Sequence, residues 1–491
     1  MNKIRSVKIN AILNILKTVC SIIFPLITIP YASRVLRAAN YGKVNWGNSI
    51  IQYFALFATL GVVTYAQREG PRIRDQKKAF EDFASEVFTV NVIATIASYL
   101  GLFAMLAFWS KARDYRNVIL IQSLIIILTT VGADWINTIY EDYFYITVRY
   151  ILIQIGSLIC LFLFVHKPED YLIYAFIMSF AAAGGNLFNI FYIQRYTHIH
   201  LVNPKYCRKH MAPTLKLFAV SLASVFYVSS DITILGIYHS NKDVGIYAIS
   251  SKVYATLRTV LNAAMVVAMP RLSFYLGHQE DHEYVALLRN IVEYLMTFIF
   301  PVICGLFMLA RPVMLILGGA EFGQGVLSLQ ILSLALFFAV FACFFASGVI
   351  LLYKRDNVYL VATLLSSAIN VILNFVLIPH FSYNGAAFTT LLAEIVMMVM
   401  TGYYSFKEDN IRDHSKDIFV NHKILISTII GSILIVMICF MMNMMIQNSI
   451  LLIIISFVLS VIVYAIVLAL FKNPIFLYVV ETMKRKFVKK S

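Results

Sequence analysis

Residues 449–471 read SILLIIISFVLSVIVYAIVLALF, an apolar stretch without a charged side chain. A helix needs about 20 mostly apolar residues to cross the hydrocarbon core of a bilayer, so this stretch predicts a membrane span. Similar stretches recur along the chain and predict about fourteen spans in all. They lie near 9–33, 45–66, 83–109, 117–139, 144–165, 171–194, 217–238, 251–274, 288–310, 327–352, 358–379, 384–406, 424–446 and 449–471. The predicted fold class is an all-α polytopic membrane protein.

The composition of the whole chain agrees with a membrane protein. Of 491 residues, 60% are hydrophobic and 13% are charged, whereas ordinary soluble domains carry about 25% charged residues. A soluble protein this apolar would lack a polar surface, and a disordered one would have the opposite balance. No segment between the predicted spans exceeds roughly twenty residues, so no separate soluble catalytic domain is predicted.

The sequence contains no motif of a catalytic or nucleotide-driven protein. P-loop, GxSxG, HExxH and GxGxxG patterns are absent. The six cysteines have neither metal-ligand nor redox spacing. We therefore expect no enzyme activity, no cofactor and no metal site, and any transport by this chain would not use ATP directly.

The positive charge is distributed as a topology signal rather than as a nucleic-acid surface. The formal net charge is +15, but the basic residues are spread over short loops between apolar runs. If the N-terminus is cytoplasmic, 28 Lys and Arg residues fall on the cytoplasmic side and 9 on the other. This asymmetry predicts that both termini are cytoplasmic, and no nucleic-acid partner is expected.

A faint internal repeat divides the first twelve spans. Gly42 aligns with Gly245, and Arg68 aligns with Arg271 at the same offset. Both glycines are interpreted as turns in the loops where a helix begins. The repeat predicts two six-helix lobes with a cavity between them, a frequent transporter design. The predicted domains are an N-terminal lobe at 1–203, a C-terminal lobe at 204–410, and two additional helices with a basic cytoplasmic tail at 411–491.

Polar side chains follow one face of the first predicted span. Asn10, Asn14, Lys17 and Ser21 recur at helical spacing. A basic residue within the membrane costs roughly 2.5–3.5 kcal/mol on insertion scales, and such residues usually face a bundle interior or a watery cavity. Lys17 is predicted to face a cavity, although its side chain could instead reach the nearby cytoplasmic interface.

The eighth predicted span repeats this arrangement. Ser251, Arg258 and Asn262 share one face, Lys252 lies in the adjacent row, and the opposite face is apolar. The predicted orientation places Arg258 near one third of the membrane depth, where reaching the interface is difficult. We therefore predict that these residues also line a cavity.

Other polar residues in or beside the spans allow two interpretations. The embedded acids would either pair with the basic residues or couple transport to an ion gradient. These acids are Asp134, Glu141, Asp231, Glu293 and Glu394. Asn370 and Asn374 share one face of the eleventh span, where they would either line the cavity or form hydrogen bonds between helices.

Lys17, Lys252 and Arg258 together would make a central cavity electropositive. Such a field favours an anionic passenger and disfavours a cationic drug. Lys and Arg in a site of low dielectric constant suit phosphate or pyrophosphate. A lipid carrier with a diphosphate head fits this description, because its tail could stay in the bilayer while the head crosses.

Several stretches, in their order along the chain, resemble Wzx-type polysaccharide flippases. They are FPLITIPYASRVL at 24–36, NYG at 40–42, SIIQYFALFATLG at 49–61, Arg68-Glu69, DITILG at 231–236, VGIYAISSK at 244–252, Asn370 with Asn374, IP at 378–379 and NGAA at 384–387. The sequence departs from the family at 37–40, where RAAN replaces a more usual turn containing Gly and Pro.

The resemblance implies a MATE-like fold, with two six-helix lobes and two C-terminal helices. It implies a flippase that moves undecaprenyl-diphosphate-linked oligosaccharide repeat units from the inner to the outer leaflet of a bacterial plasma membrane. Alternating access through the cationic cavity would be the mechanism. The implied partners are that substrate, membrane lipids, and the polysaccharide polymerase and chain-length machinery. The product could be O-antigen, capsule or exopolysaccharide.

Three other classes of protein are considered. An ion-coupled multidrug exporter of the same superfold is the main alternative, but it would need cavity acids to bind cations, and Lys17 argues against that. A membrane scaffold would not need aligned polar stripes on two helices related by a repeat. A membrane polymerase would be expected to have large outside loops, and the sequence predicts none.

Overall fold

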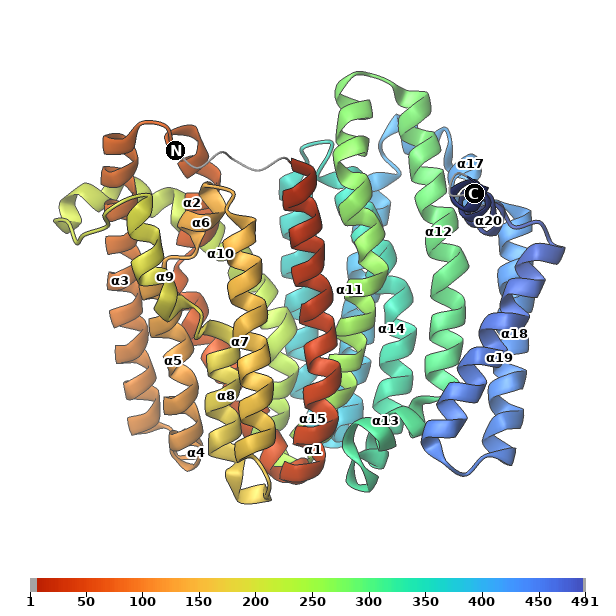
Figure 1. Ribbon diagram of the computed structural model, residues 1–491, viewed down its shortest axis with the longest axis horizontal. Helices are drawn as coiled ribbons and strands as arrows, with labels where there is room; N and C mark the ends of the chain where they lie inside the picture. Colours follow the sequence, from red (N-terminus) through yellow and green to blue (C-terminus); the bar gives the residue numbers. More distant parts are fainter. Residues whose placement is uncertain (1–6, 489–491) are drawn as a thin grey trace. The chain divides into compact units, whose positions relative to one another are not determined.

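The computed structural model describes residues 7–488, which form helices and turns without a β-strand (Figure 1). Within these residues, eleven helices are long and apolar enough to cross a membrane, and Arg116–Gly132 is a shorter apolar helix. The predicted class, an all-α multi-pass membrane protein, is confirmed. The count of fourteen spans stays a prediction.

Two compact units divide the chain, Met1–Gly245 and Ile246–Ser491. The first unit contains α1 (Val7–Thr59), α2 (Val62–Glu69), α3 (Lys77–Phe108), α4 (Ser110–Asp114), α5 (Arg116–Gly132), α6 (Trp135–Ile139), α7 (Tyr143–Phe164), α8 (Tyr171–Ala183), α9 (Asn186–Tyr192), α10 (Pro204–Tyr238) and the start of α11 (Asn241–Gly277). The second contains the rest of α11 and α12 (Asp281–Met308), α13 (Ala310–Gly318), α14 (Val326–Phe345), α15 (Asp356–Ser405), α16 (Asp409–Arg412), α17 (Ser415–Phe419), α18 (His422–Met445), α19 (Ser449–Leu470) and α20 (Pro474–Val488). The predicted domain boundaries, which rest on the repeat rather than on packing, stay a prediction.

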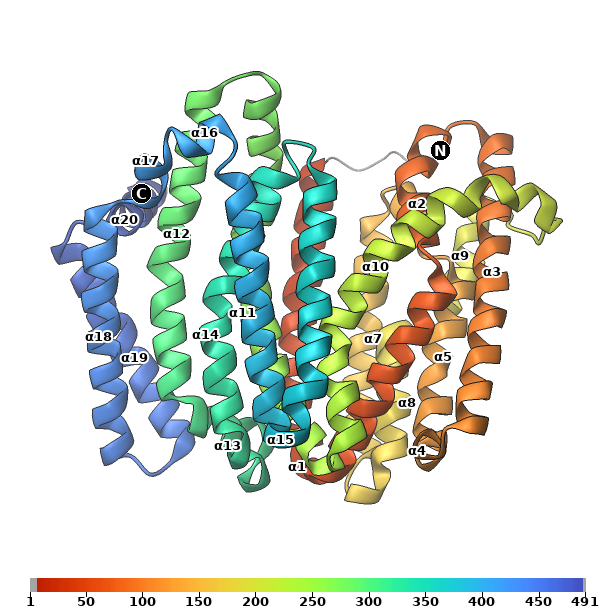
Figure 2. The same cartoon turned by 180° about the vertical axis from the view of Figure 1, so that it is seen from behind.

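The longest helices, α1 and α15, each consist of two limbs. The 53 residues of α1 would extend about 80 Å as one straight helix, far more than the roughly 30 Å core of a bilayer. The backbone leaves helical geometry at Arg37 (φ 60°, ψ 170°) in α1 and at Ser382 (φ 50°, ψ −135°) in α15. At each of these residues the chain turns back, as Figure 2 shows for both helices. Each helix therefore accounts for two of the predicted spans.

The structure corrects the ends of two predicted spans. The span expected at 45–66 is interrupted at Leu60 and Gly61, and the span expected at 117–139 is interrupted at Ala133. All three residues have positive φ angles, of 43°, 72° and 41°, which end a right-handed helix. Hydropathy misses these breaks because it measures composition and not backbone geometry. The short helices α2 and α6 follow them.

The structure also corrects the interpretation of Gly42 and Gly245. Both lie inside helices rather than in turns where helices begin. A Cβ atom on Gly42 would lie 1.8 Å from the carbonyl oxygen of Asn241, and one on Gly245 would lie 2.1 Å from that of Ala38. These glycines are therefore the contact point at which α1 and the start of α11 cross, because only a residue without a side chain permits so close an approach.

One end of the first unit holds an apolar core around α2, α3 and α6. Phe80, Phe83, Trp135, Ile136 and Ile193 are buried there. Burying a large apolar side chain contributes about 1.5–3 kcal/mol. This cluster therefore holds the short helices α2 and α6 against α3.

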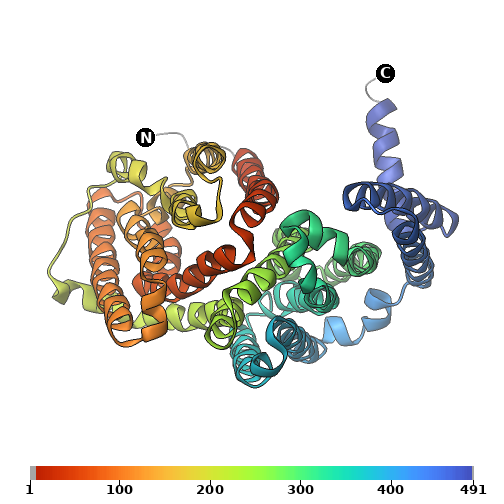
Figure 3. The same ribbon diagram turned by 90° about the horizontal axis from the view of Figure 1, so that it is seen from below.

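In the second unit, α18 and α19 pack against α12 and α13. The buried side chains between them include Leu309, Cys439, Leu452 and Tyr464. The Tyr464 hydroxyl also donates a 2.6 Å hydrogen bond to the Thr297 carbonyl oxygen on α12. Figure 3, a view from below, shows α20 lengthwise, so this last helix runs across the direction of α18 and α19.

Candidate functional site

A polar pocket of about 360 Å³ lies inside the first unit. Among the described residues, seven helices contribute to its wall: α1, α2, α5, α6, α7, α8 and α9. Its charged and polar lining side chains are Lys17, Gln67, Thr129, Asp134, Thr138, Arg149, Tyr150 and Asn186. Two of the residues predicted from the sequence, Lys17 and Asp134, are thereby brought together.

Arg149 is the most enclosed cation of this pocket. It lies in the second turn of α7, and its Nη2 atom is 2.6 Å from Oδ1 of Asp134. Its side chain is 11% exposed, whereas that of Asp134 is 37% exposed. Gly185 leaves room for it, since a Cβ there would lie 3.1 Å from Nε of Arg149. The other terminal nitrogen, Nη1, is buried and has no hydrogen-bond partner among the described residues.

Backbone geometry and amide contacts place the Asp134 carboxylate. The left-handed Ala133 ends α5 and redirects the chain into α6. The Asn137 side chain then donates hydrogen bonds to Asp134 (3.0 Å) and to Asn189 (2.6 Å). Because the carboxylate is tied to both Asn137 and Arg149, it cannot move away from the pocket wall without breaking several contacts.

Lys17 supplies the second positive charge. Its ammonium group lies 5.8 Å from the centre of the Tyr150 ring, next to Arg149 on α7. Lys17 makes no ion pair with a described residue. With two cations and one carboxylate, the pocket carries a net positive charge, and such a field attracts anions.

A pair of stacked aromatic rings lies beside the Arg149 guanidinium. The guanidinium carbon is 5.1 Å from the centre of the Tyr145 ring, which stacks in parallel on Tyr192. Tyr192 and Tyr196 both donate hydrogen bonds to Asp142, at 2.6 and 2.7 Å. Burial, followed by the hydrogen bond to Asp142, raises the pKa of Tyr196. Tyr196 therefore stays a neutral hydrogen-bond donor at physiological pH.

The second unit holds its own charged cluster. Arg258 Nη1 lies 2.8 Å from Oε1 of Glu394, and the Tyr254 hydroxyl donates to the same oxygen at 2.6 Å. Glu394 is fully buried, and the Arg258 side chain is 33% exposed. Arg258 is thus charge-compensated inside its unit. Lys252, one and a half turns away, is exposed and makes no ion pair with a described residue.

The remaining residues predicted for the second unit differ in exposure. Ser251 and Asn262 are half-buried, and the Asn262 carbonyl oxygen has no hydrogen-bond partner among the described residues. Asn370 and Asn374 are buried and bonded to one another at 3.1 Å. Thr389, on the other limb of α15, donates to Asn374. Both amides therefore take part in a hydrogen-bond network between the two limbs.

Two of the predicted acids have structural partners. Glu141 lies 2.9 Å from Arg74 outside the pocket. Glu293 is buried on α12 and accepts a 2.7 Å hydrogen bond from Asn421, directly before α18. The first contact joins the turn before α7 to the segment before α3. The second joins α18 to α12.

The other residues predicted for the first unit are spread along α1 and α10. Asn10 is buried, and its side-chain amide has no hydrogen-bond partner among the described residues. Asn14 and Ser21 are exposed. Asp231 is buried on α10. None of these four residues lines the pocket around Lys17.

Arg149 was missed by sequence reasoning. The structure places it inside α7. The signal was the same as for Lys17 and Arg258, a base within an apolar run. Gln67 and Tyr150 carry no comparable signal, because only packing brings them to the pocket.

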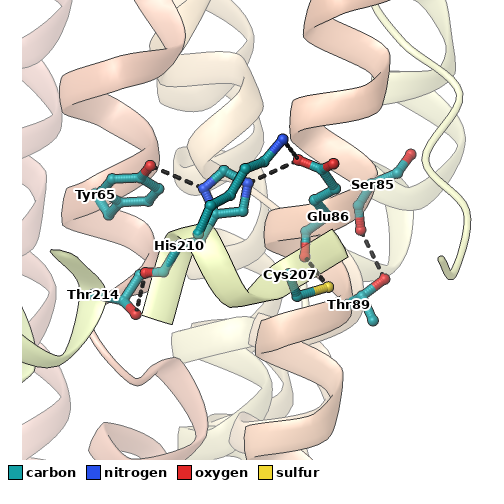
Figure 4. A network of polar contacts seen from close by, with 8 residues as sticks. Tyr65, Ser85, Glu86, Thr89, Cys207, His210 and Thr214 are labelled. Atoms are coloured by element: carbon teal, nitrogen blue, oxygen red, sulfur yellow. Dashed lines mark hydrogen bonds and ion pairs between the residues drawn. The ribbon is translucent and has the colours of Figure 1, made fainter. Parts of the chain in front are cut away.

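A second polar network, also missed, joins α2, α3 and α10 (Figure 4). The Glu86 carboxylate on α3 lies 2.8 Å from Nζ of Lys209 and 2.8 Å from Nε2 of His210. Nδ1 of His210 is 2.9 Å from the Tyr65 hydroxyl on α2. Cys207 adds a contact from its sulfur to the Glu86 carbonyl oxygen at 3.4 Å. The network attaches the first turns of α10 to the rest of the unit.

Among the described residues, no group of three His, Cys, Asp or Glu side chains is arranged to hold a metal ion. The pocket itself offers charged side chains. A guanidinium with an unused nitrogen and a nearby ammonium can bind an anionic group such as a phosphate.

The fold and the pocket define a multi-pass membrane protein with a cationic site. The chain belongs to the polysaccharide biosynthesis protein family, whose model matches residues 7–276. A probable low-salt glycan biosynthesis flippase, Agl15 of Haloferax volcanii, is 26% identical over 184 residues, which are 38% of this chain and 39% of that protein. The capsular polysaccharide biosynthesis protein CapF of Staphylococcus aureus is 23% identical over 418 residues, covering 80% of this chain and 96% of CapF.

Two solved structures show the same fold. The lipid II flippase MurJ, in an inward closed conformation, has a TM-score of 0.73 and 15% identity, with 95% of this chain and 99% of MurJ covered. An inward-facing multidrug resistance MATE transporter of the MOP superfamily has a TM-score of 0.56 and 15% identity, with 78% and 93% covered. The predicted MATE-like fold is confirmed.

Proposed function

We propose that this protein is a flippase for surface polysaccharide synthesis. It moves undecaprenyl-diphosphate-linked oligosaccharide units from the inner to the outer leaflet of a bacterial plasma membrane. It is a transporter rather than an enzyme. The observation that carries the proposal is the cationic pocket of Lys17 and Arg149 in a member of the polysaccharide biosynthesis family. The names of Agl15, CapF and MurJ, which refer to glycan flipping, capsule synthesis and lipid II flipping, support it.

The diphosphate is the part of the substrate that the protein recognises. Arg149 offers Nη1 as an unused donor, and Lys17 offers an ammonium group from the adjacent helix. Hydrogen bonds between such cations and phosphate are among the strongest in proteins. We propose Lys252 and Arg258 as further substrate-binding cations, which belong to the second unit. Alternating access is the proposed mechanism. The polyprenyl tail stays in the bilayer.

The direction of transport follows from the proposed topology. Both termini lie in the cytoplasm, where the lipid-linked sugar is assembled. A flippase of this kind supplies a polymerase and chain-length machinery on the other side, and these proteins are its proposed partners. Membrane lipids surround the helices.

A multidrug exporter is the competing function, because the fold is shared with a MATE transporter. An exporter of cationic drugs needs acids that are free to bind them. In the first unit Asp134 is tied to Arg149, and in the second Glu394 is tied to Arg258. This pairing favours an anionic passenger.

Deletion of the gene tests the proposal directly. Lipid-linked sugars are extracted and surface polysaccharide is stained, with a plasmid-borne copy as the genetic control. We expect lipid-linked repeat units to accumulate and the surface polymer to disappear, and mass spectrometry of the accumulated glycan then identifies the substrate. Unchanged polysaccharide together with increased drug sensitivity would instead assign the chain to the exporters.

A further inference from the structure

A second and larger cavity of the first unit has a different character. It is a groove of about 990 Å³ between the second limb of α1, α3 and the first turns of α10. Its lining includes Phe54, Phe57, Ile93 and Ala97. It shares no lining residue with the pocket around Lys17 and Arg149. The groove is therefore an apolar site separate from the cationic pocket.

One end of the groove is basic. Lys205 and Arg208 line it, three residues apart and so on one face of α10. Both are exposed, and neither makes an ion pair with a described residue. The acid Glu86 on α3 is already bound by two other side chains of α10, Lys209 and His210 (Figure 4). The groove therefore keeps two uncompensated positive charges.

We propose that this groove binds an anionic phospholipid of the membrane. Its phosphate contacts Lys205 and Arg208, and an acyl chain lies along Phe54, Phe57 and Ile93. The proposed topology places Lys205 and Arg208 on the cytoplasmic side. Basic residues beside the cytoplasmic ends of membrane helices attract anionic lipids, which are enriched in that leaflet. An apolar wall with two cations at one end is complementary to an amphipathic anion. A free phosphate could contact the two cations but would make no use of the apolar wall.

The lining favours a phospholipid over the sugar-bearing lipid of the proposed transport cycle. Ser98 is the one hydroxyl among the described lining residues, and it already donates to the Phe54 carbonyl oxygen at 2.6 Å. An oligosaccharide would need many hydrogen-bond partners, and these are missing here among the described lining residues. The inference rests on the proposed topology but not on the proposed substrate.

Lipid retention by the full-length protein tests the site. The protein is reconstituted in nanodiscs of equal parts dioleoyl phosphatidylglycerol and dioleoyl phosphatidylcholine, and retained lipids are counted by native mass spectrometry. We expect Lys205→Gln with Arg208→Gln to lower phosphatidylglycerol retention at least tenfold, because two charge-assisted contacts are lost. Lys77→Gln with Lys78→Gln removes the same charge from exposed positions at the start of α3, outside the groove, and should retain the lipid as the natural sequence does.

A second variant separates the groove from general surface charge. Ala97 is exposed to the groove, so Ala97→Phe should fill it and displace the lipid without changing charge or the unfolding temperature. Equal retention by the Lys205 and Arg208 double variant would overturn the proposal, as would equal retention of phosphatidylcholine. Preferential retention of added undecaprenyl phosphate would overturn the choice of phospholipid.

Discussion

At the scale of single residues, Arg149 is the group whose surroundings most clearly point to a ligand. One of its terminal nitrogens pairs with Asp134, and the other is buried without a described partner. A buried donor of this kind is costly unless something binds it. We therefore regard Arg149 and Lys17 as one anion-binding pair.

Replacing this pair should stop transport while leaving the protein in the membrane. Arg149→Ala and Lys17→Ala should each lower surface polysaccharide about tenfold or more, since a charge-assisted contact contributes about 1.5–3 kcal/mol. Polysaccharide is measured against protein level on immunoblots. Arg113→Ala, at an exposed position outside the pocket, is the control and should export normally. Normal polymer from the Lys17 and Arg149 double variant would rule out the cationic site.

Arg258 calls for a different experiment, because its removal leaves Glu394 buried and unpaired. Arg258→Ala should abolish export but also cost about 3–5 kcal/mol of stability, the range found for broken buried ion pairs. Arg258→Met combined with Glu394→Leu removes both charges and should recover most of that stability. Thermal unfolding in detergent measures stability, and polysaccharide staining measures export. Export by the stable double variant would show that Arg258 is structural only.

At the scale of elements, the crossing of α1 and α11 depends on glycine. Gly42→Ala would place a methyl group 1.8 Å from the Asn241 carbonyl oxygen, so the helices must separate and the unfolding temperature should fall by several degrees. Gly156→Ala on α7 is the matched control, since nothing lies within 4 Å of its Cβ. That variant should be neutral or gain up to about 1 kcal/mol, the helix preference of Ala over Gly. Equal melting temperatures would contradict the crossing.

At the scale of the whole molecule, the distribution of Lys and Arg predicts the topology. In a variant without the six native cysteines, Lys167→Cys should react with an impermeant maleimide in intact cells, because 167 lies in a predicted outside loop. Glu280→Cys should react only after permeabilisation, because 280 lies in a predicted cytoplasmic loop. Both positions are exposed. The reverse pattern would invert the proposed direction of transport.

Much of the fold was predictable because membrane insertion depends on local composition. Apolar stretches of sufficient length identify helices wherever they occur, and the long apolar helices among the described residues overlap the predicted spans. The breaks at Leu60 and Ala133 were not predictable, because a left-handed residue leaves hydropathy unchanged. Lys17 and Asp134 were recognised as unusual from their surroundings in the sequence, but their shared pocket was not.

The amino-acid sequence is enough to identify an all-helical multi-pass membrane protein, the bases within its spans, and the family that it resembles. Which charges meet depends on the tertiary structure. Arg258 pairs with Glu394, 136 residues away, and Asp134 pairs with Arg149 instead of Lys17. Hydropathy is a property of neighbouring residues, whereas an ion pair depends on how distant helices pack and on which side chains they bury together.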